Sequence, residues 1–284
     1  MLLTEARRAH YHRDGFIKGP RVLDDAMLAS LRSELSRVIS QQAESQVAQP
    51  LSIRNRTGDD EHPVWQVINI WEASPAYRAL LNIPGLGATI QALISGREIR
   101  LWHDQIQFKP EAIGGATMWH QDWPYWPTMS APHAVTAWIA LDDADPDNGC
   151  MSMVPGSHRW GNAIGHLHGL PRFDAVPAQY QGQPSPVQVC PVAAGEVHFH
   201  HCMTWHGSPD NTSARPRRAI ALHFMNEQVT KVPGDMHPCS HYCESADGEP
   251  IRGAHFPLIW SADGVPGQAL APVEPAALVG AASR

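Results

Sequence analysis

The residues with the clearest chemical potential are a histidine and an aspartate two positions apart, His120 and Asp122, in the segment WHQD. If this segment is a strand, both side chains point to one face and can reach the same metal ion. A third ligand must come from a distant segment, and His206, in the segment TWHGS, is the best candidate. Two imidazoles and one carboxylate leave three coordination positions open, which suits non-haem Fe(II) that binds O₂ and a bidentate co-substrate.

The H-x-D spacing is a weak signal on its own. The chain contains 17 histidines, so one such triplet can arise by accident. The same three ligands could also hold zinc in a metallohydrolase, which uses an activated water. A third possibility is a jelly-roll domain without metal that binds a small ligand and has no catalytic role.

An arginine eleven residues after His206, Arg217, favours iron with a keto-diacid co-substrate. Residues 218–224 have the pattern of a strand, so we expect His206 and Arg217 on neighbouring strands of a hairpin. A guanidinium can grip a carboxylate through two parallel hydrogen bonds, as the far end of an iron-chelating 2-oxoglutarate would require. Arg215 and Arg218 compete for this role by proximity, and all three could form a solvated basic turn.

The elements that must position these residues change character along the chain. The pattern of residues 1–96 is mainly helical. From residue 97 to residue 226, short apolar-alternating runs are separated by Gly, Pro, Asn and Asp, which predicts one antiparallel β-core. Residues 227–284 form a C-terminal extension, and its tail from Ala262 is expected to be loosely held. We therefore predict a single domain over residues 1–284, mostly β with flanking helices.

Three helices are predicted in the N-terminal part, after a short lead-in over residues 1–19. The first is capped by Asp24 or Asp25 and runs to about Gln42. A second begins at Ser74-Pro75, and a third runs from Pro84 to Gly96. The intervening residues 43–63 are polar and turn-rich and predict a mobile loop that carries Arg54 and Arg56.

Composition narrows the cellular context. The formal net charge of −7 disfavours nucleic acid as a partner, because phosphate binding needs a basic surface. Five cysteines, an odd number, fit reduced thiols better than a disulfide framework. The first residues lack the apolar core of a signal peptide, and no run of eighteen apolar residues predicts a membrane span. We expect a cytoplasmic protein with a small-molecule substrate, and its oligomeric state stays open.

Four longer motifs occur in a specific order. HRDGF stands at 12–16, and QFKP at 107–110 leads to WHQD. WIALD at 138–142 is followed by NGCM and VPGSH, and the segment from His206 to Arg217 closes the series. In this order the motifs resemble those of the phytanoyl-CoA dioxygenase family, which includes the ectoine hydroxylases, over roughly residues 10–226.

The resemblance implies a double-stranded β-helix core (a jelly-roll, cupin-like fold) and an oxygenase that uses Fe(II), 2-oxoglutarate and O₂. Its iron ligands fall on His120, Asp122 and His206, and its carboxylate-binding arginine falls on Arg217. Some relatives halogenate and lack the carboxylate ligand, so the presence of Asp122 favours hydroxylation, desaturation or ring closure. Four further residues fall in the family's co-substrate pocket, although each could equally serve packing, a turn or an exposed strand face: Trp138, Ser208, Gln105 and Gln107.

The substrate is expected above the iron, against loops. The segment that follows WHQD supplies Trp123, Tyr125 and Trp126, which could form one aromatic wall or simply pack a proline-bracketed loop. Weaker candidates are Arg54, Arg56, His133 and Trp205. The segment 237–243 alternates His and Cys and suggests zinc, but the spacing is unlike that of structural zinc sites, and a loop beside the substrate entrance is favoured.

Overall fold

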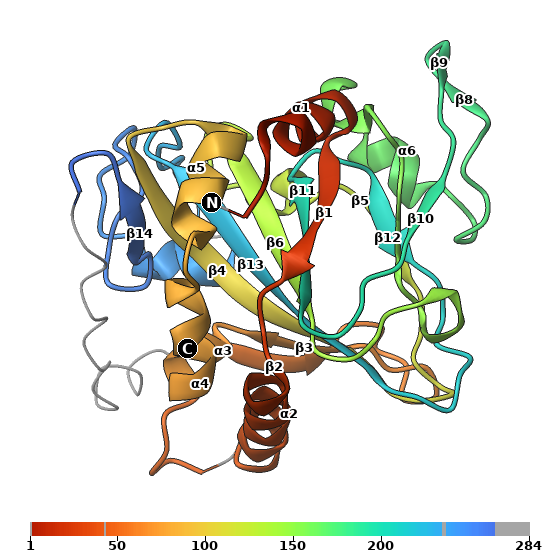
Figure 1. Cartoon of the computed structure of the whole chain (residues 1–284), viewed down its shortest axis with the longest axis horizontal. Coiled ribbons are helices and arrows are strands. Elements are labelled where there is room, and N and C mark those ends of the chain that lie inside the picture. The colour runs from red at the N-terminus through yellow and green to blue at the C-terminus, as the bar shows by residue number, and fades with distance from the viewer. Residues whose placement is uncertain (1, 43, 235–236, 265–284) are drawn as a thin grey trace.

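The computed structural model describes residues 2–42, 44–234 and 237–264, and it is mostly β with helices at its flanks (Figure 1). The strands of the large sheet are β1 (Phe16–Arg21), β2 (Ser52–Asn55), β3 (Trp65–Ile68), β4 (Glu98–Lys109), β6 (Ala134–Ala140), β11 (Glu196–His201), β13 (Arg217–Asn226) and β14 (Leu258–Ser261). The strands of the smaller sheet are β5 (Thr117–His120), β7 (Met151–Met153), β10 (Gln188–Cys190) and β12 (His206–Ser208).

Both sheets are antiparallel. The large sheet has the order β1-β11-β6-β13-β4-β3-β2, with β14 also paired to β4, and the smaller has the order β10-β7-β12-β5. A separate hairpin joins β8 (Gln179–Tyr180) to β9 (Gln183–Pro184). This arrangement is the double-stranded β-helix, or jelly roll, that the motifs predict.

The centre of the large sheet is covered on both faces, which is why β6 is buried at every position. Side chains alternate between the two faces of a strand. Ala137 and Ile139 therefore join the apolar cluster beneath the helices, whereas Trp138 and Ala140 pack toward Met151 of the smaller sheet. The second face is the one on which polar residues gather.

The helices pack on the first of these faces (Figure 1). They are α1 (Glu5–Asp14), α2 (Asp25–Ser40), α3 (Ile70–Ala73), α4 (Pro75–Ala79), α5 (Leu86–Ile94) and, apart from them, α6 (Ile164–His168). Short 3₁₀ turns complete the set: η1 (Leu80–Asn82), η2 (Trp123–Tyr125), η3 (Pro146–Asn148), η4 (Ser157–Arg159) and η5 (Pro238–Tyr242). Among the described residues no helix is long and apolar enough to cross a membrane.

Two of the three predicted helix starts agree with the structure, whereas α5 begins at Leu86, after the N-cap Gly85, and not at Pro84. Asp24 caps α2, because its side chain accepts a hydrogen bond from the backbone N–H of Met27. Leu28, Leu31 and Leu35 of that helix are buried, as its periodicity predicts. Pro75 occupies the first turn of α4.

Strands at both ends of the chain were not predicted. The lead-in over residues 1–19 contains α1 and most of β1, which pairs with β11. The predicted loop over 43–63 contains β2, and β2 and β3 extend the large sheet beyond β4. The sheet is thus not confined to residues 97–226, and β14 contributes to it from the C-terminal extension. Most of the tail predicted to be loosely held lies outside the described residues.

Candidate metal centre and co-substrate pocket

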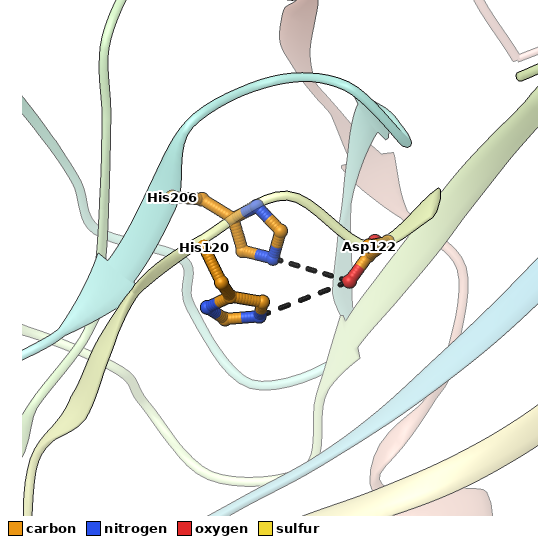
Figure 2. A group of neighbouring side chains, drawn as sticks. All are labelled: His120, Asp122 and His206. Carbon is orange, nitrogen blue, oxygen red and sulfur yellow. Dashed lines mark ion pairs between the residues drawn. The ribbon is translucent and has the colours of Figure 1, made fainter. Parts of the chain in front are cut away.

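Two histidines and one aspartate from separate segments converge on a common point (Figure 2). The ligand atoms of His120, Asp122 and His206 all lie within 4.8 Å of one another, and the three residues are buried. Asp122 Oδ1 lies 3.8 Å from His120 Nε2 and 3.5 Å from His206 Nε2. These distances leave room for one ion between the three atoms.

The sheet places the two histidines opposite each other. His120 is the last residue of β5 and His206 is the first of β12, and the two are direct partners in the strand register. Asp122 lies beyond the end of β5, with helical backbone angles (φ −72°, ψ −48°), and its N–H donates to the carbonyl of Cys202. The prediction that a continuous strand would align Asp122 with His120 was therefore wrong; a turn after the strand brings the carboxylate in.

Both imidazoles present the same nitrogen to the centre. His120 Nδ1 lies 2.8 Å from the carbonyl oxygen of Met118, and His206 Nδ1 lies 2.9 Å from that of Thr204. A carbonyl accepts only from a protonated Nδ1, so each Nε2 keeps its lone pair for the ion. The donor set and its tautomers fit a divalent metal.

The second carboxylate oxygen of Asp122, Oδ2, contacts Thr136 and His200. Oδ2 accepts a hydrogen bond from Thr136 Oγ1 at 3.0 Å and lies 3.3 Å from His200 Nε2. Burial opposes ionisation of this carboxyl, but the neighbouring His206 and His200 outweigh it and hold the pKa of Asp122 well below its usual range. The carboxylate therefore stays charged and correctly turned.

Arg217, the first residue of β13, is 1% exposed. Its Nη1 donates to the carbonyl of Gln107, and its charged carbon lies 5.7 Å from the ring centre of Trp138. Within the described residues, Nε and Nη2 have no hydrogen-bond partner. A buried guanidinium with unpaired donors is costly unless a ligand carboxylate completes it.

The two competing arginines are already paired. Arg215 binds Asp145, and Arg218 binds Asp142 through two hydrogen bonds. The predicted hairpin between His206 and Arg217 was wrong, because β12 pairs with β5 and β7 in the smaller sheet, whereas β13 pairs with β4 and β6 in the large one. The arginine and the histidine thus lie on strands of different sheets.

A narrow cavity of about 10 Å³ extends from the metal ligands between the two sheets. A volume of this size holds no more than one water, so a keto-diacid would enter only if the lining side chains move. The four residues assigned by resemblance all line this cavity, with Trp138 and Ser208 buried. They are Gln105, Gln107, Trp138 and Ser208.

A second cavity of about 250 Å³ opens on the other side of His120 and Asp122. Tyr125 and Trp126 line it, whereas Trp123 packs into an adjacent apolar cluster. Of the weaker candidates, Arg54 and Arg56 line the cavity, and His133 and Trp205 lie elsewhere. Three further lining residues were missed by sequence reasoning: Gln66, His103 and His223. His103 could have been predicted from the sequence. It stands two and four residues before Gln105 and Gln107 on β4, so all three side chains point to the same face of the strand.

The segment 237–243 folds as η5 and not as an extended strand. His237 lines the second cavity, Cys239 is buried and His241 is exposed. In the described part of the chain, no group of potential metal ligands includes any of these residues. The segment therefore borders the candidate substrate cavity, as predicted.

Comparisons with known proteins agree with the fold and with the family that the motifs resemble. The sequence profile of the family described as phytanoyl-CoA dioxygenase matches residues 11–219. An ectoine dioxygenase of Bordetella bronchiseptica is 26% identical over 241 residues, which is 78% of this chain and 75% of that protein.

Two solved structures from nogalamycin biosynthesis are similar over nearly their whole length. The carbocyclase SnoK, titled as non-haem and α-ketoglutarate-dependent, is 26% identical with a TM-score of 0.72, covering 91% of this chain and 97% of its own. The epimerase SnoN, in complex with Fe³⁺, α-ketoglutarate and nogalamycin RO, is 26% identical with a TM-score of 0.69, covering 90% and 98%.

A jelly roll with this donor set and a buried arginine with unpaired donors is typical of an oxygenase that depends on Fe(II) and 2-oxoglutarate and uses O₂, and the similar proteins are of this class. The family match covers well over half of the chain. The chain belongs to the phytanoyl-CoA dioxygenase family.

Proposed function

We propose that this dioxygenase hydroxylates an unactivated C–H bond of a small molecule, with iron bound by His120, Asp122 and His206 and 2-oxoglutarate anchored by Arg217. The observation that carries the proposal is the pairing of two features across one jelly roll. Both Nε2 atoms face the carboxylate of Asp122, and a buried guanidinium with unpaired donors packs over Trp138, which lines the cavity beside them.

When bound, Fe(II) with 2-oxoglutarate and O₂ supplies the oxidising power for C–H cleavage, with release of succinate and CO₂. The protein's own work is placement and exclusion of water. Thr136 keeps the carboxylate of Asp122 turned toward the centre, and Trp138 flanks the guanidinium of Arg217. We assign no side chain as a general base.

A second outcome of the same chemistry is favoured by the solved structures. SnoK is a carbocyclase and SnoN is an epimerase. Removal of hydrogen without transfer of a hydroxyl, giving ring closure or inversion, is therefore the alternative product class. Asp122 favours both over halogenation, in which the carboxylate is replaced.

The proposed ligand set is tested by anaerobic addition of Fe(II) and 2-oxoglutarate. A visible charge-transfer band is expected for the wild-type protein and for the exposed control Asp174→Ala, and not for Asp122→Ala. Coupled formation of succinate should also be lost only in Asp122→Ala. A protein that binds metal but gives no band would support the metallohydrolase, and one that binds neither would support a non-catalytic domain.

We also propose a reduced, cytoplasmic setting. All five cysteines are free, which supports this setting. Absence of nucleic acid as a partner stays a prediction, as does the treatment of the whole chain as a single domain.

A further inference from the structure

The 250 Å³ cavity beside the metal ligands has the volume of roughly eight water molecules at about 30 Å³ each. It therefore suits a compact molecule, or the reacting end of a larger one. One wall is built by the edge strands β2 and β3, which follow β4 in the large sheet (Figure 1). A further cavity of about 350 Å³ shares Arg56 and Tyr125 with it, so these two side chains stand where the cavities meet.

Two arginines from this wall face the cavity without a countercharge. In the described residues, neither Arg54 nor Arg56 forms an ion pair or a hydrogen bond to a carboxylate. Arg56 is half-buried, and loss of solvent lowers the pKa of its guanidinium, only partly offset by Tyr125 and Asp122. A cation drawn out of water and left unpaired indicates a missing anionic partner.

A chain of side-chain hydrogen bonds links the polar residues of the same wall. Arg54 and Gln66 are direct partners across β2 and β3, and Arg54 Nε donates to Gln66 Oε1 at 2.8 Å. Gln66 Nε2 in turn donates to Gln105 Oε1. This chain of hydrogen bonds engages both amide oxygens as acceptors, and the Nε2 donors of Gln105 and the Nη donors of Arg54 are not part of it. The wall therefore presents several N–H donors.

The charges at the metal centre do not neutralise the positive charges of Arg54 and Arg56. Doubly charged iron is offset by the carboxylate of Asp122 and by one carboxylate of 2-oxoglutarate, and the other carboxylate pairs with Arg217 under the proposed function. This leaves Arg54 and Arg56 as surplus positive charge on the substrate side.

The facing wall adds no charge. Burial, with His103 and Arg54 nearby, lowers the pKa of His237 to about 2, so its ring is neutral at physiological pH. Trp126, which packs against His103, and Tyr125, which stands near Arg56, supply aromatic surface to the cavity. A ligand that fits has an acidic group at one end and an apolar or ring-shaped body at the other.

We propose that the substrate carries a carboxylate, and that Arg56, assisted by Arg54, binds this group at the mouth of the cavity and so directs the rest of the molecule toward the metal. The inference rests on the proposed function for its metal and co-substrate, and it names the class of substrate for that site.

The test uses the chain loaded with catalytically inert Mn(II) and saturating 2-oxoglutarate, so that Arg217 is already occupied. Benzoate, cyclohexanecarboxylate, L-proline and pyroglutamate are titrated by calorimetry, each against its primary amide. At least one acid should bind at least tenfold more tightly than its amide. Arg56→Gln should weaken that acid on the order of tenfold to a hundredfold, and Arg54→Gln by less, as expected for charge-assisted hydrogen bonds.

Arg97→Gln is the matched control, because Arg97 forms an exposed pair with Asp263 and lies outside both cavities. It should leave every titration unchanged. If no acid binds better than its amide, or if Arg56→Gln leaves the preference intact, the inference is overturned even though Mn(II) and 2-oxoglutarate bind. If Arg56→Gln weakens 2-oxoglutarate itself, Arg56 belongs to the co-substrate site and the inference is equally overturned. If the wild-type protein did not bind 2-oxoglutarate, that result would contradict the proposed function and not this inference.

Discussion

Thr136 Oγ1 lies 3.0 Å from Asp122 Oδ2, while the other carboxylate oxygen faces the two imidazoles. The hydroxyl also lies 2.8 Å from His223 Nδ1. It can donate to the carboxylate only if the imidazole N–H donates to it, so the three groups form an ordered chain. Residues of this kind orient a metal ligand without touching the metal.

Replacement of this hydroxyl should weaken metal binding. Thr136→Val keeps the shape but removes the donor, so the carboxylate of Asp122 is free to rotate. We expect the dissociation constant for Mn(II) to rise by about 10- to 100-fold. Thr136→Ser retains the donor and should bind nearly as the wild type does. Equal affinities for the Val and Ser variants, measured by metal titration, would contradict this role.

Gly207 maintains the contact between the two histidine strands. A Cβ at this position would lie 2.9 Å from the carbonyl oxygen of Thr117 and 3.2 Å from the backbone nitrogen of Trp119. Both are backbone atoms of β5 and cannot move aside cheaply. Gly207→Ala should therefore push β12 from β5, separate His206 from His120, and destabilise the fold by about 1–3 kcal/mol.

The control for this substitution is Gly165→Ala in α6, where a Cβ meets nothing within 4 Å. It should leave metal affinity unchanged and should not lower the free energy of unfolding. Denaturant titrations and Mn(II) titrations of both variants check the pair. Unaltered metal affinity in Gly207→Ala would show that the strand contact does not set the ligand geometry.

Arg217→Lys should lose most of the affinity for 2-oxoglutarate. The lysine keeps the charge but cannot form two parallel hydrogen bonds to a carboxylate. We expect the dissociation constant of 2-oxoglutarate, followed anaerobically by the charge-transfer band, to rise roughly 10- to 100-fold. The exposed neighbour, in Arg215→Lys, should show no change. A similar loss of 2-oxoglutarate affinity in both variants would show that Arg217 has no specific role in binding the carboxylate.

The sequence pointed to the three candidate metal ligands that the structure brings together, because their chemistry is concentrated in short motifs. His120 and His206 stand in segments whose order along the chain is itself informative, and the structure makes them register partners. The α2 cap at Asp24 was equally readable, because a capping side chain acts on its own next turn. Short motifs thus gave residues that converge in the structure, although the geometric reason offered for Asp122 was wrong.

What could not be predicted depends on contacts between distant segments. The four residues of β2 are only partly buried and show no alternation, so nothing in them signals a strand. They become one through pairing with β3, which in turn pairs with β4. That pairing brings Arg54 and Arg56 to the cavity. The assignment of β12 and β13 to different sheets has the same origin, because loop length alone does not distinguish a hairpin from a crossing between sheets.

Metal binding should stabilise the folded protein through His206. A ligand that binds only the native state at a hundred times its dissociation constant adds about 2.7 kcal/mol to the free energy of unfolding. For a chain of this size we expect Mn(II) to raise the Tm by roughly 5–10 °C. His206→Ala should abolish the rise, since two ligands remain. The competing site is the exposed group of Asp59, Glu61 and His62, and Glu61→Gln should leave the rise intact. Loss of the rise in Glu61→Gln and its survival in His206→Ala would place the metal on the surface and refute the centre at β5 and β12.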